Sequence, residues 1–375
     1  MAGCKRIKQS DHENNLITVD VRSNYPQKEL TLQEFMDVEY ILLETNDEFL
    51  HQGVVLDIGQ ENIIIKNRIN DGDIFIYDRN GKGVRKINRK GQGPGEYSFI
   101  FGITLDEENN EMFINDLSKG IMVYDLYGNF IRSFHGFIGA FSMSMHHFDN
   151  AHFLFFNDTW MGTEDTPGSS FAIISKEDGS IVKEIKIHYK EIVDRHLTVM
   201  ANGMSRSVTT TYTPIIPFQD SWIITELSSD TIFMLSQDYS MIPFIVRTPS
   251  IHAMNPEIFF SPVVLTDRYY FLQTQRKEYD FKTETGFPST KLMYDRKEQK
   301  MYEYTVINDD YTIKKTIDFP KSTLSRKEIA FWQIIEAHGL VESYEKGELK
   351  GKLKEIAATM DEEDNPVIML IKNKK

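Results

Sequence analysis

The run Ile-Phe-Ile-Tyr-Asp-Arg-Asn-Gly at residues 74–81 has a close copy, Ile-Met-Val-Tyr-Asp-Leu-Tyr-Gly, at residues 121–128. A third copy stands at 171–179, and weaker copies stand at 232–238 and 292–297. Each copy reads as an apolar strand, a turn rich in Asp, Asn or Gly, and the start of a second strand. When the copies are aligned, the equivalent positions Asp78, Asp125, Ser175, Ser236 and Asp295 are 47, 50, 61 and 59 residues apart. The chain is therefore built from a repeated strand unit.

A further strand-like segment precedes each copy, and the five segments are residues 63–65, 112–114, 153–156, 222–224 and 269–272. Three or four short strands per unit of ~40 to 60 residues are typical of the blades of a β-propeller. Five units are visible, and the apolar runs 17–19, 40–43 and 367–371 would supply a sixth from the two ends of the chain. We therefore predict an all-β, six-bladed β-propeller over residues 16–375, preceded by a tether at 1–15.

Composition limits the function. Length alone suggests two or three domains, but the repeat assigns the 375 residues to one ring. An apolar fraction of 41%, with 12% aromatic residues, is enough for a packed core and excludes a disordered chain. The 42 Lys and Arg residues against 56 Asp and Glu residues give a net charge of −14, which argues against a nucleic-acid partner.

The single cysteine, Cys4, follows Ala2 and Gly3 and precedes a polar run. One cysteine excludes an internal disulfide and a thiolate zinc cluster. A small-residue pair before a cysteine matches the end of a bacterial lipoprotein signal, whose apolar part would lie upstream of Met1. A cytosolic chain with a cysteine near its start is the alternative.

The first repeat is followed at residues 85–97 by a segment that ends Gly-Gln-Gly-Pro-Gly-Glu-Tyr. This segment, with residues 43–48 and 361–366, resembles the six-bladed β-propeller lipoproteins abundant in Gram-negative gut anaerobes, which are similar to NHL-repeat propellers. The resemblance implies an exported protein, periplasmic or in the outer membrane, that is anchored to the membrane only through a lipid on Cys4. It implies little about chemistry.

The glycines of that segment, Gly91, Gly93 and Gly95, permit close approach of the backbone, and Pro94 fixes one φ angle. A tight crossover between two blades is the structural interpretation. The alternative is a cradle of backbone N–H groups for phosphate, but no helix pattern follows the loop, as such motifs require.

Three insertions exceed the length of a blade and are expected to protrude as loops, where binding residues are common. In the first, Trp160 could stack on a sugar ring with help from Asp158 and Glu164, although a tryptophan folded onto the rim is the competing interpretation. In the second, Arg276 could contact an anion, against a solvated hairpin. The third spans residues 189–214 and includes Arg195, His196 and Arg206.

His146, His147 and His152 lie close together in the sequence, near Asp149. His146 and His147 would point to opposite faces of a strand, which argues against a shared metal ion. His152 could pair across strands with either of them. No linear motif of a nucleophile elbow, a zinc protease or a phosphate-binding loop is present, so catalytic residues remain unassigned.

Residues 322–360 change to helical spacing. We expect a first helix from a cap at Ser325, with Ile329, Trp332 and Ile335 on its apolar face, and a second at 348–360 with Leu349, Leu353, Ile356 and Ala357 turned inward.

These observations predict a monomeric, exported binding or scaffolding module that handles a glycan or an envelope protein, with no cofactor. The alternative function is a hydrolase or lyase of a saccharide or lactone with its site at the mouth of the central channel, where a calcium ion could bind. Charged residues from at least three blades would favour the enzyme. An exposed apolar patch would favour a protein-interaction platform.

Overall fold

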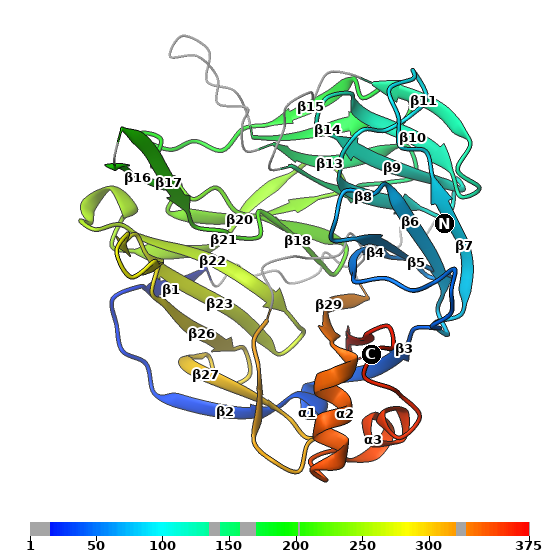
Figure 1. Ribbon diagram of the computed structural model, residues 1–375. Coiled ribbons are helices and arrows are strands. Elements are labelled where there is room, and N and C mark those ends of the chain that lie inside the picture. Colours follow the sequence, from blue (N-terminus) through cyan, green and yellow to red (C-terminus); the bar gives the residue numbers. More distant parts are fainter. Residues whose placement is uncertain (1–15, 135–142, 158–169, 202, 320–327, 375) are drawn as a thin grey trace, which may run out of the picture.

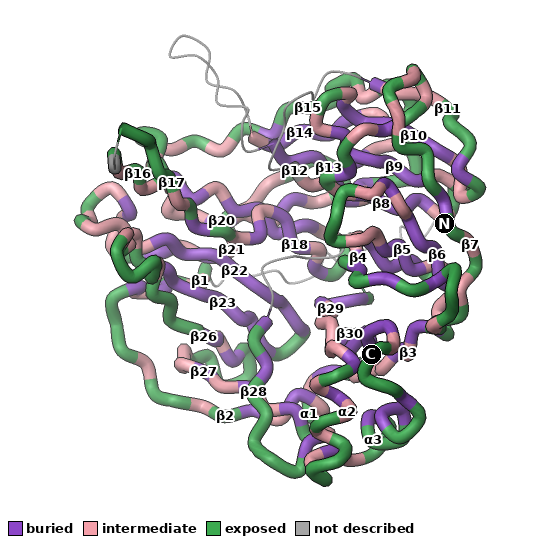
Figure 2. Tube along the Cα trace, in the orientation of Figure 1, coloured by how far each residue is buried: buried purple, intermediate pink, exposed green. Residues whose placement is uncertain are grey.

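The computed structural model describes residues 16–134, 143–157, 170–201, 203–319 and 328–374. Within these residues the strands form six antiparallel blades arranged in a ring (Figure 1). The predicted all-β, six-bladed propeller is confirmed. In Figure 2 the blade strands are largely buried and the connections are largely exposed.

The first three blades have four strands each: β4 (Gly53–Ile58), β5 (Asn62–Asn67), β6 (Asp73–Asp78) and β7 (Gly83–Asn88); β8 (Ile100–Asp106), β9 (Glu111–Asp116), β10 (Gly120–Asp125) and β11 (Phe130–Phe134); β12 (Met143–His147), β13 (His152–Asn157), β14 (Phe171–Ser175) and β15 (Ile181–Ile185). Blades four and five are β18 (Ile215–Phe218), β19 (Ser221–Ile224), β20 (Thr231–Ser236) and β21 (Met241–Thr248); β22 (Ile258–Leu265), β23 (Tyr269–Arg276), β26 (Ser289–Asp295) and β27 (Lys300–Asn308), with β28 (Lys315–Ile317) beside β27. Within the described residues, blade six consists of β29 (Ile329–Ile335), β30 (Val367–Asn373) and β3 (Met36–Leu42).

The repeated turn sets the geometry of the blades. Each aligned repeat position ends the third strand of its blade. Asp78 Oδ1 accepts the N–H groups of Asn80 and Lys82, and Asp125 makes the same bonds one blade later. Gly81 has a φ of +83°, and a Cβ there would lie 1.9 Å from the carbonyl oxygen of Leu42, so only glycine fits at this joint between blades six and one.

Apolar side chains from neighbouring blades interlock to form the core. Between blades two and three, for example, the rings of Phe113 and Phe153 meet edge to face with centroids 4.8 Å apart. Both faces of every blade are buried in this way, which explains the nearly continuous apolar runs in the second and third strands.

The sixth blade joins the two ends of the chain, as predicted, because β3 pairs with β30 along its full length. One expectation was wrong. Residues 17–19 do not join this blade; β1 (Ile17–Asp20) pairs in parallel with β21 of blade four, and β2 (Gln27–Thr31) pairs in parallel with β27 of blade five. A short helix, α1 (Leu32–Phe35), then leads into β3. The N-terminal segment therefore crosses the outer edges of two blades before it closes the ring.

The predicted helix that carries Ile329, Trp332 and Ile335 is also wrong, because these residues form β29 and pair with β30. Ser325 lies outside the described residues. Within 322–360 the described helices are α2 (Ala337–Glu345) and α3 (Gly351–Ala357). Leu349, Leu353, Ile356 and Ala357 are buried as predicted. No helix in the described part of the chain is long and apolar enough to span a membrane.

One face of the ring carries the long connections, and we call it the loop face. In an antiparallel blade, the turns after the first and third strands lie on one side, whereas the connections after the second strand and the crossovers to the next blade lie on the other. The loop face therefore bears two extra hairpins, β16 (His196–Ala201) with β17 (Met204–Thr209) and β24 (Tyr279–Asp280) with β25 (Thr285–Gly286). Arg206 and Glu284 join the two hairpins through a 2.8 Å ion pair.

The glycine-rich crossover at 91–97 is a joint between blades one and two. Gly93 N–H donates to Glu96 Oε2 at 2.8 Å, and the hydroxyl of the buried Tyr97 donates to the carbonyl of Gly72 at 2.7 Å. The Lys119 ammonium lies among the carbonyl oxygens of Gly91, Gly93 and Glu96. A loop whose own carboxylate and lysine fill its polar groups supports the structural interpretation over a phosphate cradle.

The N-terminal segment is held to blade five by a buried carboxylate. Lys28 of β2 and Arg268 donate to Asp295 Oδ2 at 2.9 and 3.1 Å. Burial opposes ionisation of Asp295, but the bonds from Arg268 and Lys28 prevail and lower the pKa of this carboxyl to about 2.

Asp295→Asn tests this anchor. A lowered pKa stabilises the fold above the ordinary pKa of 3.8, and the stabilisation is lost as the pH falls toward 2. We expect the variant to lose about 2 kcal/mol of unfolding free energy at pH 7 in urea titrations and to approach wild type below pH 3. Asp37→Asn, at an exposed position of β3, is the control. A deficit independent of pH would contradict this role.

Candidate functional site

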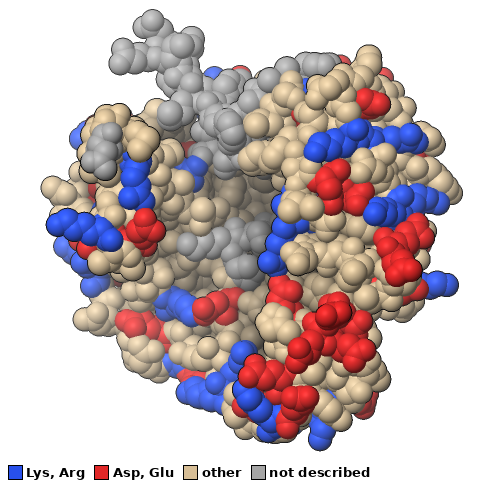
Figure 3. Space-filling view, viewed as in Figure 1, with Lys and Arg blue, Asp and Glu red and all other residues tan. Residues whose placement is uncertain are grey.

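A polar cavity of about 440 Å³ opens on the loop face at blade four. Three segments build it: the crossover from blade three, the connection between β19 and β20, and the crossover to blade five. Its lining consists of His188, Tyr189, Lys190, Ser228, Ser229, Asp230, Thr231, Ser250, His252 and Ala253. Figure 3 shows that this face is also hollowed near the centre of the ring. The hydroxyl, imidazole and carboxylate groups suit a small polar ligand better than an apolar one.

Asp230 is fixed in place by the backbone that follows blade four. Its Oδ1 accepts the N–H of Ile251 at 2.8 Å, at the start of the short helix η1 (Ile251–Ala253). The buried guanidinium of Arg247 lies 3.8 Å from the same oxygen and donates to the carbonyl of Pro249. Burial lowers the pKa of Arg247 to about 10, which leaves it charged at neutral pH. Asp230 is thus held as a carboxylate beside the cavity.

His252 occupies the next position on η1, with a side chain only 10% exposed. Its Nε2 lies 3.0 Å from the carbonyl oxygen of Ser228. A carbonyl only accepts hydrogen bonds, so Nε2 carries the proton and donates. Nδ1 lies 3.6 Å from Glu191 Oε1, beyond hydrogen-bond distance. The imidazole therefore presents a fixed tautomer in the wall of the cavity.

A buried polar cluster adjoins the cavity through Ser228, whose N–H donates to Glu226 Oε1 at 3.2 Å. Burial raises the pKa of the Glu226 carboxyl, and the bonds from Ser228 and the charge of Arg195 oppose this only in part. Arg195 donates to the carbonyl of Thr210 at 3.0 Å, and the Thr210 hydroxyl donates to Gln275 of blade five at 2.6 Å. A buried carboxyl with a raised pKa beside a cavity is a marker of a functional site.

The chemical capacity of the site follows from these groups. Fixed acceptors at Asp230 and His252, with the hydroxyls of the lining, suit hydrogen bonds to a polar ligand, and Glu226 is suited to carry a proton. Among the described residues, no three His, Cys, Asp or Glu side chains lie close enough to hold a metal ion.

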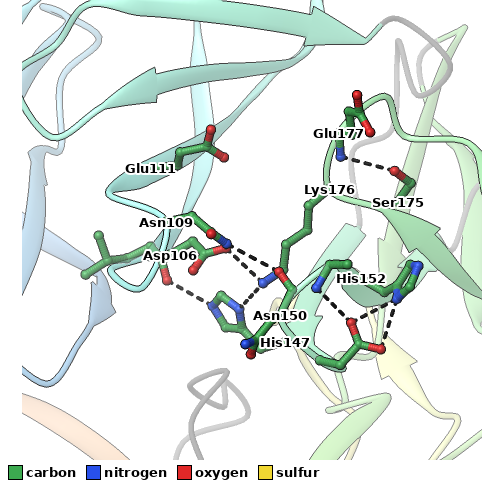
Figure 4. A network of polar contacts seen from close by, with 12 residues as sticks. Asp106, Asn109, Glu111, His147, Asn150, His152, Ser175, Lys176 and Glu177 are labelled. Atoms are coloured by element: carbon green, nitrogen blue, oxygen red, sulfur yellow. Dashed lines mark hydrogen bonds and ion pairs between the residues drawn. The ribbon is translucent and has the colours of Figure 1, made fainter.

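A second polar cluster, at the joint between blades two and three, contains the predicted histidines (Figure 4). The Lys176 ammonium donates to Asp106 Oδ2 at 2.8 Å and to His147 Nδ1 at 3.1 Å. His147 Nε2 donates to the carbonyl of Leu105 at 2.9 Å. Both ring nitrogens of His147 are thereby occupied, so the cluster connects the two blades.

The other two histidines lie apart from this pairing. His146 and His147 face opposite sides of β12, as predicted, and burial lowers the pKa of His146 to about 3. The register places His152 opposite Ser175 and His147 opposite Phe153, so the predicted cross-strand histidine pair is wrong. His152 instead bonds to Asp149 at 2.8 Å, because the tight turn brings these two side chains together.

Lys176→Met tests the joint. Both members of the Lys176–Asp106 pair are almost fully buried, so removal of the cation leaves an uncompensated carboxylate. We expect a loss of about 3–5 kcal/mol in unfolding free energy, measured by urea titration. Lys183→Met, on the exposed edge strand β15, should cost far less. Equal losses in both variants would rule out the joint.

Cys4, Asp158, Trp160 and Glu164 lie outside the described residues. Arg276 ends β23, is about half exposed, and lies 3.8 Å from Glu278. The predicted third insertion is the crossover that carries β16, β17 and Arg195. The structure therefore brings together Arg195 and the cavity region, but it does not place Arg276 in the cavity lining.

Sequence reasoning missed Glu226, Asp230 and His252. The only available signal was the polar run Thr-Glu-Leu-Ser-Ser-Asp at 225–230, directly after an apolar strand. His252 lies 22 residues beyond Asp230 in the sequence, so no local spacing connects them.

Comparisons with known proteins agree with the fold. A chain from Bacteroides fragilis NCTC 9343 with the description "Putative exported protein" superimposes with a TM-score of 0.59 and 15% identity, over 96% of this chain and 100% of that chain. At that identity the likeness shows the fold alone. A chain of an S. cerevisiae complex of Dbp5 and Nup159 gives a TM-score of 0.40 at 8% identity, over 85% and 75% of the two chains. Virginiamycin B lyase from Staphylococcus aureus gives 0.32 at 12%, over 68% and 73%.

The last two scores are too low to carry an argument. No curated protein matches the chain. A family model described as "Domain of unknown function (DUF4934)" matches residues 16–372. Because that match spans nearly the whole chain, this protein belongs to the DUF4934 family.

Proposed function

We propose that this protein is an exported binding module that takes a small saccharide in the loop-face cavity at blade four. One observation carries the proposal: three separate segments converge to line a cavity of about 440 Å³ with hydroxyl, imidazole and carboxylate groups. Such groups match the hydroxyls of a sugar, and the rigid ring beneath holds them in place.

The alternative of catalysis is favoured by one feature, the Glu226 carboxyl with its raised pKa. A protonated carboxyl is suited to act as a general acid toward a glycosidic oxygen. Residues of the blade-three crossover, blade four and blade five meet around it, through Arg195, Ser228 and Gln275. Binding alone needs no such acid, so turnover separates the two functions.

A glycan array followed by calorimetry tests the proposal. We expect at least one glycan to bind, and the double variant His188→Ala/Tyr189→Ala to weaken binding at least tenfold, because two side chains of the lining are removed. The matched control is His196→Ala, at an exposed histidine of the β16–β17 hairpin outside the lining. Unchanged affinity in the double variant would place binding elsewhere, and an array without ligands would reject the proposal.

The same incubations identify an enzyme. Release of new reducing or unsaturated ends by wild type, and its loss in Glu226→Gln, would assign hydrolase or lyase activity to this site.

We propose further that Cys4 carries a lipid that anchors the exported protein at the cell envelope. Support comes from Gly3–Cys4 followed by a polar run, from the resemblance to propeller lipoproteins, and from the description of the Bacteroides fragilis neighbour as exported. The NHL-like character belongs to the same resemblance.

Metabolic labelling tests the anchor. In the source organism, radiolabelled palmitate should enter the wild-type protein, which should fractionate with membranes. Cys4→Ser on the chromosome should abolish the label and release the protein from the membrane fraction. A labelled Cys4→Ser protein, or an unlabelled wild type, would refute acylation at Cys4.

A further inference from the structure

The hydrogen bonds around the cavity fix which ligands it can accept. Asp230 Oδ1 is occupied by the N–H of Ile251 and lies near Arg247, and His252 Nε2 is occupied by the carbonyl of Ser228. The polar atoms of these two residues that lack a hydrogen-bond partner within the described chain are Asp230 Oδ2 and His252 Nδ1. At neutral pH both are acceptors. The two residues are joined through Ile251, which directly precedes His252, so the two acceptors belong to one wall.

We propose that Asp230 and His252 form a paired acceptor that selects neutral ligands rich in hydroxyl donors, and that protonation of His252 releases such ligands. The inference rests on the proposed function of the cavity and adds its ligand chemistry and its regulation. A carboxylate in this wall repels an anionic ligand, whereas a hydroxyl donates to both acceptors.

Acid changes only one of the two acceptors in kind. Protonation turns His252 Nδ1 from an acceptor into a donor, and Glu191 Oε1 stands 3.6 Å away as the counter-charge for the imidazolium. The Nε2 bond to Ser228 is kept in both states, because Nε2 is a donor in both. The ring therefore needs no reorientation. A ligand hydroxyl that donated to Nδ1 is left facing a donor.

The charged groups around His252 come from every segment of the cavity. Glu191, Lys190 and His188 lie on the crossover from blade three, Asp230 lies on the connection of blade four, and Arg247 lies on β21. Glu191 and Asp230 favour the imidazolium, whereas Lys190 and Arg247 oppose it. Histidine is the side chain whose charge ordinarily changes between pH 5 and 8, which sets the range to be examined.

Calorimetry at pH 8 and pH 5, with the best glycan of the array, tests the ligand half of the inference. We expect about tenfold weaker binding by wild type at pH 5, because one ligand hydrogen bond is lost and an unpaired donor is left. His252→Gln can keep the donor to Ser228 and does not titrate, so its two affinities should agree within about twofold. The control His196→Gln should keep the wild-type dependence.

Nitrogen NMR of the ligand-free full chain, with His252→Gln for assignment, tests the tautomer separately. At pH 8 the His252 Nδ1 should be unprotonated and Nε2 protonated, and acid should protonate Nδ1. The opposite tautomer, or equal wild-type affinities at pH 8 and pH 5, would overturn this inference and leave the proposed function standing. An array without ligands at pH 8 would overturn the proposed function and this inference together. Preference for an anionic glycan would overturn the selectivity alone.

Discussion

The pairing of β3 with β30 is the contact on which the ring depends. It joins residues 36–42 to residues 367–373, and the Asn365 side chain secures it by donating to the carbonyls of Glu44 and Phe49 and accepting from the N–H of His51. Each blade buries both faces against its neighbours. Opening this one joint would therefore expose two apolar faces at once, which makes closure a condition for the stability of all six blades.

Closure also explains the asymmetry between the two faces of the ring. The turn glycines and the Asp-based turns fit against the preceding blade with no room for a side chain, as Gly81 does against Leu42. The turn face is fixed by these contacts. The connections of the loop face have no such partner in every blade, so they vary in length and carry the two hairpins, the helices α2 and α3, and the cavity. A rigid ring with one variable face is suited to holding ligand groups in place.

Much of the fold could be predicted from sequence because its signals are local. The alternation and turn residues around Asp78 and Asp125 define a blade without reference to the rest of the chain. Residues 329–335 were misread because Ile329, Trp332 and Ile335 also fit helical spacing, and only the pairing with β30 decides for a strand. Ile17 was misplaced for a similar reason, since an edge strand joins whichever blade is adjacent. The site was harder still, because Asp230 and His252 meet only through the crossover between two blades.

The two histidine clusters show why residue type alone does not identify a site. His147 and His252 each donate from Nε2 to a backbone carbonyl, with nearly equal distances of 2.9 and 3.0 Å. They differ at Nδ1. In His147 this atom accepts from the Lys176 ammonium, so the ring is fully used in joining two blades. In His252 the nearest charged group to Nδ1 is a carboxylate at 3.6 Å, which cannot donate when ionised. An acceptor held in a cavity wall beside a counter-charge can respond to a ligand and to pH, whereas an acceptor already bonded to an ammonium responds to neither.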